Sequence, residues 1–163
     1  MASYRPEDLD FAETAPIQIE AVEAVDGSRQ EVWDVLLDYP GWTTWFSSLK
    51  ECRATSDPAT GIGSTRMVKL AGGATFDERF IAWDEPSVWA FTGTAGPPLF
   101  ESLVERVTLR ELSPTRTQVT YRMAIRPRRG LSPLVKVARG GVQKNLTTAL
   151  RSLNTVVVGA RES

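Results

Sequence analysis

The chain has 163 residues, of which 42% are apolar and 24% charged, and its net charge is −1. This length favours one domain with a core large enough to fold alone, and the balanced charge argues against a nucleic-acid binder. The chain has no histidine and a single cysteine, Cys52. These counts exclude an internal disulfide, argue against a structural zinc site and remove Ser-His and Cys-His catalysis.

Residues 1–16 are acidic and lack the apolar segment of a secretory signal. We expect a flexible leader over residues 1–16, a single domain over residues 17–158 and a short tail over residues 159–163. The lone cysteine fits a reducing compartment, so we expect a cytoplasmic protein. We expect no metal and no cofactor.

Residues 17–25 alternate between apolar and polar side chains and predict a strand. The turn that follows offers Ser28 as a helix N-cap, with Glu31 as its capping-box partner. A short amphipathic helix should then run to the Tyr39-Pro40-Gly41 stop, and a second short helix or turn should span residues 42–46.

The next eighty residues alternate between strand-like segments and turns. Gly72-Gly73 is typical of a two-residue hairpin turn. In the last segment Val119, Tyr121, Met123 and Ile125 alternate with polar residues, so only one face of the sheet should be buried. We predict strands over residues 49–54, 64–71, 75–83, 88–94, 100–112 and 117–125.

A long helix is predicted over residues 132–157, where Ser132 suits the N-cap and Pro133 the first helical position. Apolar residues recur there every three or four positions and mark one face: Val135, Ala138, Val142, Leu146, Ala149, Leu153 and Val156. Gly140-Gly141 interrupts the pattern. It either separates two shorter helices or marks a bend or a thinned surface that widens a cavity entrance.

Successive hairpins predict one antiparallel sheet with the long helix over one face. A twisted sheet of about seven strands tends to curl, and a curled sheet around a helix leaves space between them. We therefore predict an α+β fold. A curved antiparallel sheet of about seven strands wraps around a long C-terminal helix, and two short helices follow the first strand.

Residues 28–42, SRQEVWDVLLDYPGW, and Trp45 resemble the opening pattern of the START-like superfamily. This superfamily is also called polyketide cyclase/dehydrase-like, SRPBCC or Bet v 1-like. Its pattern is a Val-Trp-x-x-Leu helix and then an Asp-aromatic-x-x-Trp bend. The Gly61-Ile62-Gly63 turn and the hairpin at residues 78–86 extend the resemblance, which covers residues 17–157. It implies the helix-grip fold with a deep, mainly apolar cavity, and it leaves the substrate open.

Apolar side chains at inward positions are candidate ligand contacts as a set, although for any single one of them core packing is the interpretation that we favour. The candidate ligand-binding residues are Trp45, Phe46, Phe76, Phe80, Trp89, Phe91, Leu103, Tyr121, Met123, Val142, Leu146 and Leu150.

Glu78 and Glu105 fall on the apolar sides of their predicted strands and, with Tyr121, are the candidate catalytic groups. Two carboxylates in a cavity could serve as acid and base for enolisation or dehydration, and Tyr121 could donate to a ligand carbonyl. The interpretation that we favour for the carboxylates is simpler. A strand twist places them in solvent, or Lys69 or another basic group neutralises them.

A run of cations surrounds the start of the long helix: Arg126, Arg128, Arg129, Lys136 and Arg139. Such a run is most simply a solvated face. The alternative is transient contact with an anionic membrane or an acidic partner.

These observations favour a carrier or sensor of a small hydrophobic ligand such as a lipid, polyketide or isoprenoid. The first alternative is a metal-free cyclase or dehydratase that uses a cavity carboxylate and Tyr121, and the absence of histidine weakens it. The second alternative is a protein-interaction module with a vestigial cavity. The sequence leaves the oligomeric state open.

Overall fold

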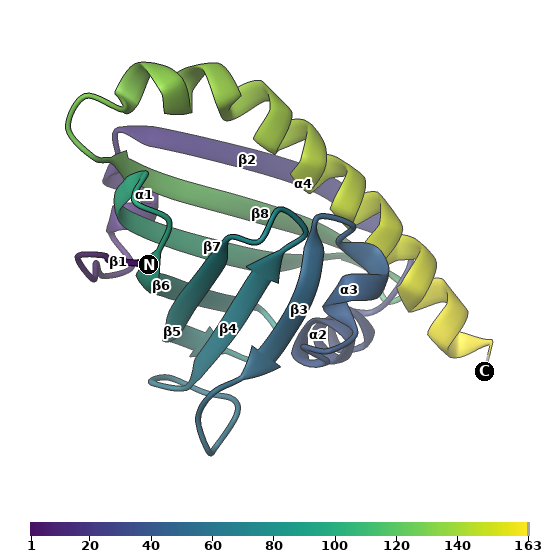
Figure 1. Ribbon diagram of the computed structural model, residues 1–163. Helices are drawn as coiled ribbons and strands as arrows, with labels where there is room; N and C mark the ends of the chain where they lie inside the picture. The colour runs from purple at the N-terminus through teal and green to yellow at the C-terminus, as the bar shows by residue number, and fades with distance from the viewer. Residues whose placement is uncertain (163) are drawn as a thin grey trace.

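The computed structural model describes residues 1–162. One antiparallel sheet forms the body of the molecule, and the long C-terminal helix lies across one face of it (Figure 1). The helices are α1 (Phe11–Thr14), α2 (Arg29–Leu37), α3 (Trp42–Trp45) and α4 (Ser132–Arg161). The strands are β1 (Ala2–Ser3), β2 (Ile17–Val25), β3 (Leu49–Ala54), β4 (Thr65–Leu70), β5 (Thr75–Asp84), β6 (Val88–Gly96), β7 (Phe100–Ser113) and β8 (Arg116–Pro127).

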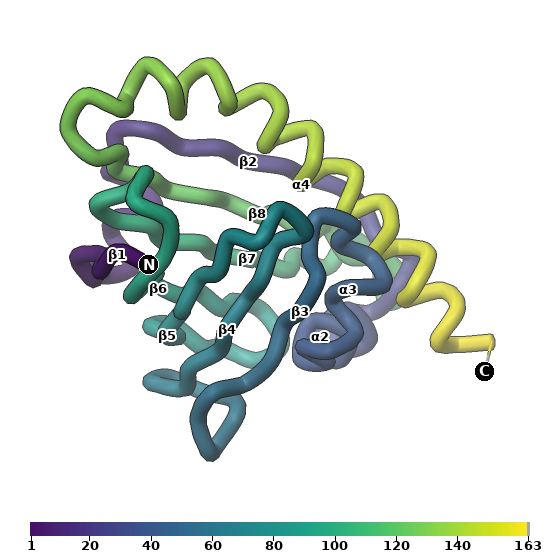
Figure 2. Tube along the Cα trace, viewed as in Figure 1, coloured from purple at the N-terminus to yellow at the C-terminus, as the bar shows by residue number. Residues whose placement is uncertain are grey.

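The strand order is β2-β8-β7-β6-β5-β4-β3, and β1 pairs with β6 off this path. Register shifts within the β5–β6 pair bend the sheet, as β-bulges do. Figure 2 shows the result: β2 and β8 follow α4, whereas β3, β4 and β5 turn across the opening beneath it. This curved sheet around a long helix confirms the predicted helix-grip fold.

The predicted capping box at the start of α2 is present. The Ser28 hydroxyl accepts from the Glu31 amide, and the Glu31 carboxylate accepts from the Ser28 amide at 2.7 Å. Such a box satisfies two amides that the first helical turn leaves unpaired. The indole of Trp42 donates to the Leu36 carbonyl at 2.9 Å and ties α3 to the end of α2. Together α2 and α3 occupy the end of the sheet beside β3 (Figure 1).

Helix α4 runs without interruption through Gly140-Gly141, so the two-helix alternative is wrong. Ser132 is its first residue rather than its N-cap. Leu131 holds the N-cap position and provides no side-chain cap. The second half of the helix supplies most of the buried face, with Leu146, Ala149, Leu150, Leu153 and Val157. No helix within residues 1–162 is both long and apolar enough to cross a bilayer.

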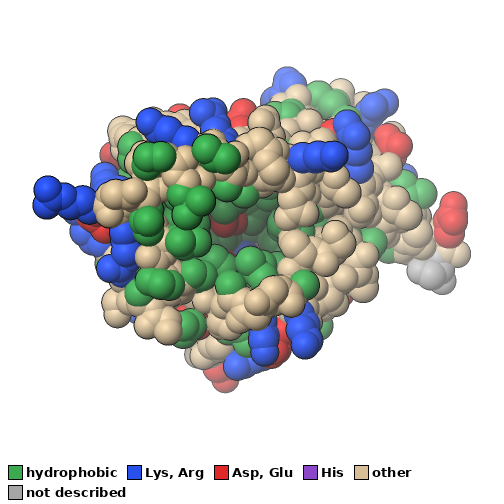
Figure 3. All heavy atoms as spheres, turned by 45° about the horizontal axis from the view of Figure 1, so that its top comes forward, with side chains coloured by type: hydrophobic (Ala, Val, Ile, Leu, Met, Phe, Trp, Pro, Cys, Tyr) green, Lys and Arg blue, Asp and Glu red, His purple; other side chains and the backbone are tan. Residues whose placement is uncertain are grey.

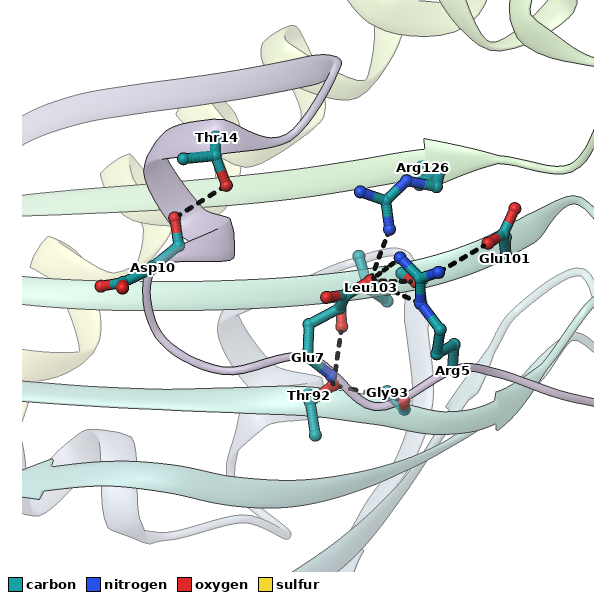
Figure 4. Close-up of polar contacts among 10 residues, drawn as sticks. Arg5, Glu7, Asp10, Thr14, Thr92, Gly93, Glu101, Leu103 and Arg126 are labelled. Atoms are coloured by element: carbon teal, nitrogen blue, oxygen red, sulfur yellow. Dashed lines mark hydrogen bonds and ion pairs between the residues drawn. The ribbon is translucent and has the colours of Figure 1, made fainter.

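The N-terminal segment is packed against the sheet, so the expectation of a flexible leader is wrong. Phe11 is only 3% exposed and joins Val104 and Ala124 in a small apolar cluster, separate from the main core. Figure 4 shows Glu7 among its partners: it accepts from Arg126 and from Arg5, which also pairs with Glu101. The acidic composition suggested solvation, whereas Glu7 and Glu13 form ion pairs with arginines of the sheet.

Candidate ligand cavity

A cavity of about 240 Å³ lies between the inner face of the sheet and the middle of α4. It opens on the surface shown in Figure 3, where apolar side chains surround a hollow and acidic atoms are visible inside it. The volume lies just below the usual range of small-molecule sites, about 300–1,000 Å³.

The walls come from elements that are far apart in the chain. Seven of the apolar or aromatic residues proposed from the sequence line the cavity: Phe46, Phe76, Leu103, Tyr121, Met123, Val142 and Leu146. The other five, Trp45, Phe80, Trp89, Phe91 and Leu150, are not among the lining residues and are buried in the main core. Alternation along a strand shows which face is buried, but it does not separate a cavity wall from the core behind it.

An ion pair lies at the polar floor of the cavity. Arg66 on β4 stands directly opposite Glu78 on β5, and its Nε donates to Glu78 Oε2 at 2.6 Å. Arg66 is 1% exposed and Glu78 is 5% exposed, so the pair is almost fully withdrawn from water. The guanidinium carbon of Arg66 lies 4.3 Å from the ring centre of Trp42 and 4.8 Å from that of Phe91. These aromatic faces give the cation a second favourable contact.

A second polar pair lies beside the first. The hydroxyl of Tyr121 on β8 donates to the carboxyl group of Glu105 on β7, and both residues line the cavity. Burial, and then the negative charge of Glu78, raise the pKa of Glu105 to about 8. Burial and the neighbouring Glu105 also raise the pKa of Tyr121. At neutral pH the Tyr121 phenol and most of the Glu105 carboxyl therefore hold their protons.

The charge state of the first pair follows from its contacts. Burial raises the pKa of Glu78, and the charge and hydrogen bond of Arg66 oppose that shift. Burial alone would lower the pKa of Arg66, but the Glu78 carboxylate outweighs it and raises that pKa. A guanidinium does not lose its proton in proteins, so an uncharged Glu78 would leave Arg66 unpaired. The floor thus holds one cation, one carboxylate and one neutral acid.

Both carboxyl groups point into the molecule, so the favoured interpretation that strand twist exposes them is wrong. The other expectation, that a basic group neutralises the carboxylates, is confirmed for Glu78 alone. A basic group does neutralise Glu78, but the group is Arg66 rather than Lys69, and no ion pair is recorded for Glu105 within residues 1–162. The alternation of β4 places Arg66 on the face that also carries Val68 and Leu70, and this signal could have identified it.

The mouth of the cavity has polar residues that the sequence analysis did not identify. Asn145 on α4 donates to the Ser48 hydroxyl at 3.0 Å, and both residues line the cavity. This bond joins the helix to the start of β3 beside the opening. Trp42, Leu49, Val68, Leu70 and Phe100 complete the apolar wall.

Comparison with solved structures supports the fold. The chain matches the Zhui aromatase/cyclase from Streptomyces sp. R1128 with a TM-score of 0.74 at 17% identity, covering 86% of this chain and 93% of that one. It matches a START superfamily protein from Mycobacterium smegmatis with a TM-score of 0.73 at 14% identity, covering 88% and 98%. A major latex-like protein from Panax ginseng gives 0.67 at 14% identity, covering 85% and 95%.

Sequence comparison identifies the family. Proteins from Mycobacterium tuberculosis and Mycobacterium bovis, both described as uncharacterized, are 32% identical over 83 residues. These matches cover 51% of this chain and 50% of the relatives, so the chain spans about half the length of the curated relatives it matches. The sequence model of the family described as "Polyketide cyclase / dehydrase and lipid transport" matches residues 16–158. The chain therefore belongs to the polyketide cyclase/dehydrase and lipid transport family.

Proposed function

We propose that the protein binds a small, mainly apolar molecule in this cavity, as a carrier or sensor, and holds one oxygen atom of that molecule at the polar floor. The observation that supports this most directly is the composition of the site. Arg66, Glu78, Glu105 and Tyr121 all line a cavity whose other walls are mainly apolar. A few placed polar groups among apolar walls are typical of small-molecule sites. The open space between sheet and helix also argues against the alternative of a protein-interaction module with a vestigial cavity.

The charges at the floor favour a neutral oxygen over a carboxylate. Glu78 already neutralises Arg66, so a ligand carboxylate would add an unpaired negative charge in a buried site. A ketone or ester oxygen can instead accept a hydrogen bond from the protonated carboxyl group of Glu105. It can also accept from Nη1 of Arg66, a buried atom with no hydrogen-bond partner within residues 1–162.

One observation favours a second function, a cyclase- or dehydratase-like enzyme. The neutral acid Glu105 and the carboxylate Glu78 line the same cavity. Two carboxyl groups in opposite protonation states can divide acid and base roles. Glu78 would remove a proton next to a ligand carbonyl, and Glu105 would protonate the carbonyl oxygen to give the enol.

Native mass spectrometry of the full chain, purified from its own host, tests the binding proposal. We expect an added mass that disappears on denaturation, and its formula should contain a neutral oxygen and few charged groups. Host-purified protein without any added mass, which also fails to take up the neutral dye N-phenylnaphthylamine, would contradict the proposal.

The variant Glu105→Gln separates the carrier from the enzyme. An amide keeps the size and the hydrogen-bonding capacity of the neutral acid but cannot transfer its proton. Binding of the molecule found by mass spectrometry should stay within about threefold, because the hydrogen bond to its oxygen is kept. If the protein also converts that molecule, turnover should fall by about 10²-fold or more. Unchanged turnover would exclude Glu105 as the acid.

A further inference from the structure

The first half of α4 exposes apolar side chains to solvent. Val137 is 85% exposed and Leu134 is 57% exposed, although both lie in a helix whose second half is well buried. Exposed apolar residues are ordinary when isolated, but two in adjacent turns of one helix need an explanation.

These side chains lie on a stripe that leads to the cavity mouth. Leu134, Val137, Gly141 and Asn145 follow one another at steps of three, four and four residues, which is one face of a helix. The stripe ends at Asn145, which lines the cavity beside the Ser48 hydroxyl. Figure 3 shows that apolar side chains also lie on the surface around the hollow.

The charges of this region have a single sign. Helix α4 contains no Asp or Glu. In its second half the cations are paired, Arg151 with Glu23 and Arg161 with Glu31. In its first half Lys136, Arg139 and Lys144 have no ion pair recorded within residues 1–162.

Two of the five cations singled out in the sequence have internal partners. Arg126 pairs with Glu7, and Arg128 donates to the carbonyls of Phe100 and Ser3. Arg129, by contrast, is exposed in the loop before α4. Cations at the start of a helix oppose its dipole, so the lysine in the first turns is not explained by helix stability.

We propose that the first half of α4 docks on an anionic lipid bilayer, with Leu134 and Val137 entering the interface and the mouth of the cavity facing the membrane. By helical spacing, Val137 and Lys144 share the side of α4 that faces away from the sheet, and Leu134 and Lys136 flank it. Long lysine side chains on this side of the helix can reach the headgroups while Leu134 and Val137 enter the interface. Each cation near an anionic leaflet adds electrostatic attraction to the membrane.

A bilayer fits this surface better than a protein partner does. A stable protein interface needs about 800 Å² on each side, and two side chains on a convex helix provide far less. A bilayer needs no matching surface, because the side chains insert between lipids. The docking rests on exposed residues alone and does not depend on what the cavity binds.

Co-sedimentation of the full chain with lipid vesicles tests the proposal. We expect binding to vesicles of phosphatidylcholine mixed with phosphatidylglycerol, little binding to phosphatidylcholine alone, and weaker binding as salt is raised. Leu134→Ser/Val137→Ser should lower the partition by about tenfold or more, because the inserted apolar surface is lost. Lys136→Glu/Lys144→Glu should lower it similarly on the anionic vesicles.

A matched control variant shows whether the loss of binding is specific to the apolar residues of α4. Ile62→Ser/Leu112→Ser removes two exposed apolar side chains from loops and strand ends away from α4, and its partition should match that of the unmodified protein. No binding to anionic vesicles, or binding that Leu134→Ser/Val137→Ser leaves unchanged, would overturn the proposal. So would a concentration-dependent dimer that the same variant abolishes, because a second copy would then cover the stripe. Dye uptake by the variant in solution should be unchanged, which separates this test from that of the cavity.

Discussion

The charged residues of the cavity floor are held in place by one another. Arg66 donates to Glu78 across neighbouring strands and packs against aromatic rings. The guanidinium is only 1% exposed, but the Glu78 carboxylate and the ring faces both stabilise its charge. A buried ion pair rarely stabilises a fold relative to apolar residues, but it is costly to break. The pair is therefore better explained by what it presents to the cavity than by stability.

Replacing one partner should reveal that cost. We expect Glu78→Ala to lower the free energy of unfolding by about 3–5 kcal/mol, because Arg66 would remain buried and unpaired. Urea denaturation measures this change. The double variant Arg66→Leu/Glu78→Leu should recover most of the loss. Equal destabilisation by the single and double variants would show that the ion pair is not the cause.

The pH dependence of stability should report Glu105. Its pKa is raised to about 8 in the folded protein, well above its usual value near 4.5, so the folded state binds the proton more tightly than the unfolded state. This contribution is complete below about pH 4.5 and is lost as pH rises toward 8.

Between pH 5.5 and 8.5 the unmodified protein should therefore lose about 3 kcal/mol relative to Glu105→Gln. Urea titrations of the two proteins at several pH values measure the difference. If the free energies of unfolding of the two proteins change equally with pH across this range, Glu105 is ionised throughout.

Among the elements of the fold, the N-terminal segment differs most from the sequence prediction. Its fixed position comes from a few partners that are distant in the chain, namely β6 for Ala2–Ser3 and Arg126 for Glu7. No local sequence pattern predicts contacts between residues that are so far apart in the chain. Elements with strong local signals, such as the Ser28 capping box of α2, were predicted with their bounds nearly correct.

The packing of this segment should be measurable. Phe11→Ala should lower the free energy of unfolding by about 3 kcal/mol, because the ring is 3% exposed and its removal leaves a cavity. Leu9→Ala, two residues earlier and 37% exposed, should change stability by less than about 0.5 kcal/mol. Equal effects of the two changes in thermal or urea unfolding would mean that the segment is not docked as described.

The adjacent glycines Gly140 and Gly141 of α4 are tolerated rather than needed for packing. A Cβ atom at Gly140 or Gly141 would meet nothing within 4 Å, whereas at Gly96 it would lie 2.4 Å from the Tyr4 hydroxyl. Gly141→Ala should therefore raise stability by about 0.5–1 kcal/mol, and Gly96→Ala should lower it. Thermal denaturation distinguishes the two signs. A loss of stability in Gly141→Ala would mean that the helix requires flexibility there.

Over the whole molecule, hydrophobic periodicity predicted the strand series, the long helix and the curved sheet that grips it. Alternation also placed Met123 and Tyr121 on the inner face correctly. It could not predict which inner residues face empty space, because that depends on how far α4 stands from the sheet. Phe80, Trp89 and Phe91 share the inner face with Phe76, yet only Phe76 reaches the cavity.

A dye titration tests directly whether the space between the sheet and α4 binds a small apolar molecule. N-phenylnaphthylamine fluorescence should rise on binding to the unmodified protein. Met123→Trp should weaken that binding by about tenfold or more, because a larger side chain fills the cavity. Val22→Trp places the same ring on an exposed position of β2 and should bind as the unmodified protein does. Equal affinity in all three proteins would show that the space between the sheet and α4 is not the binding site.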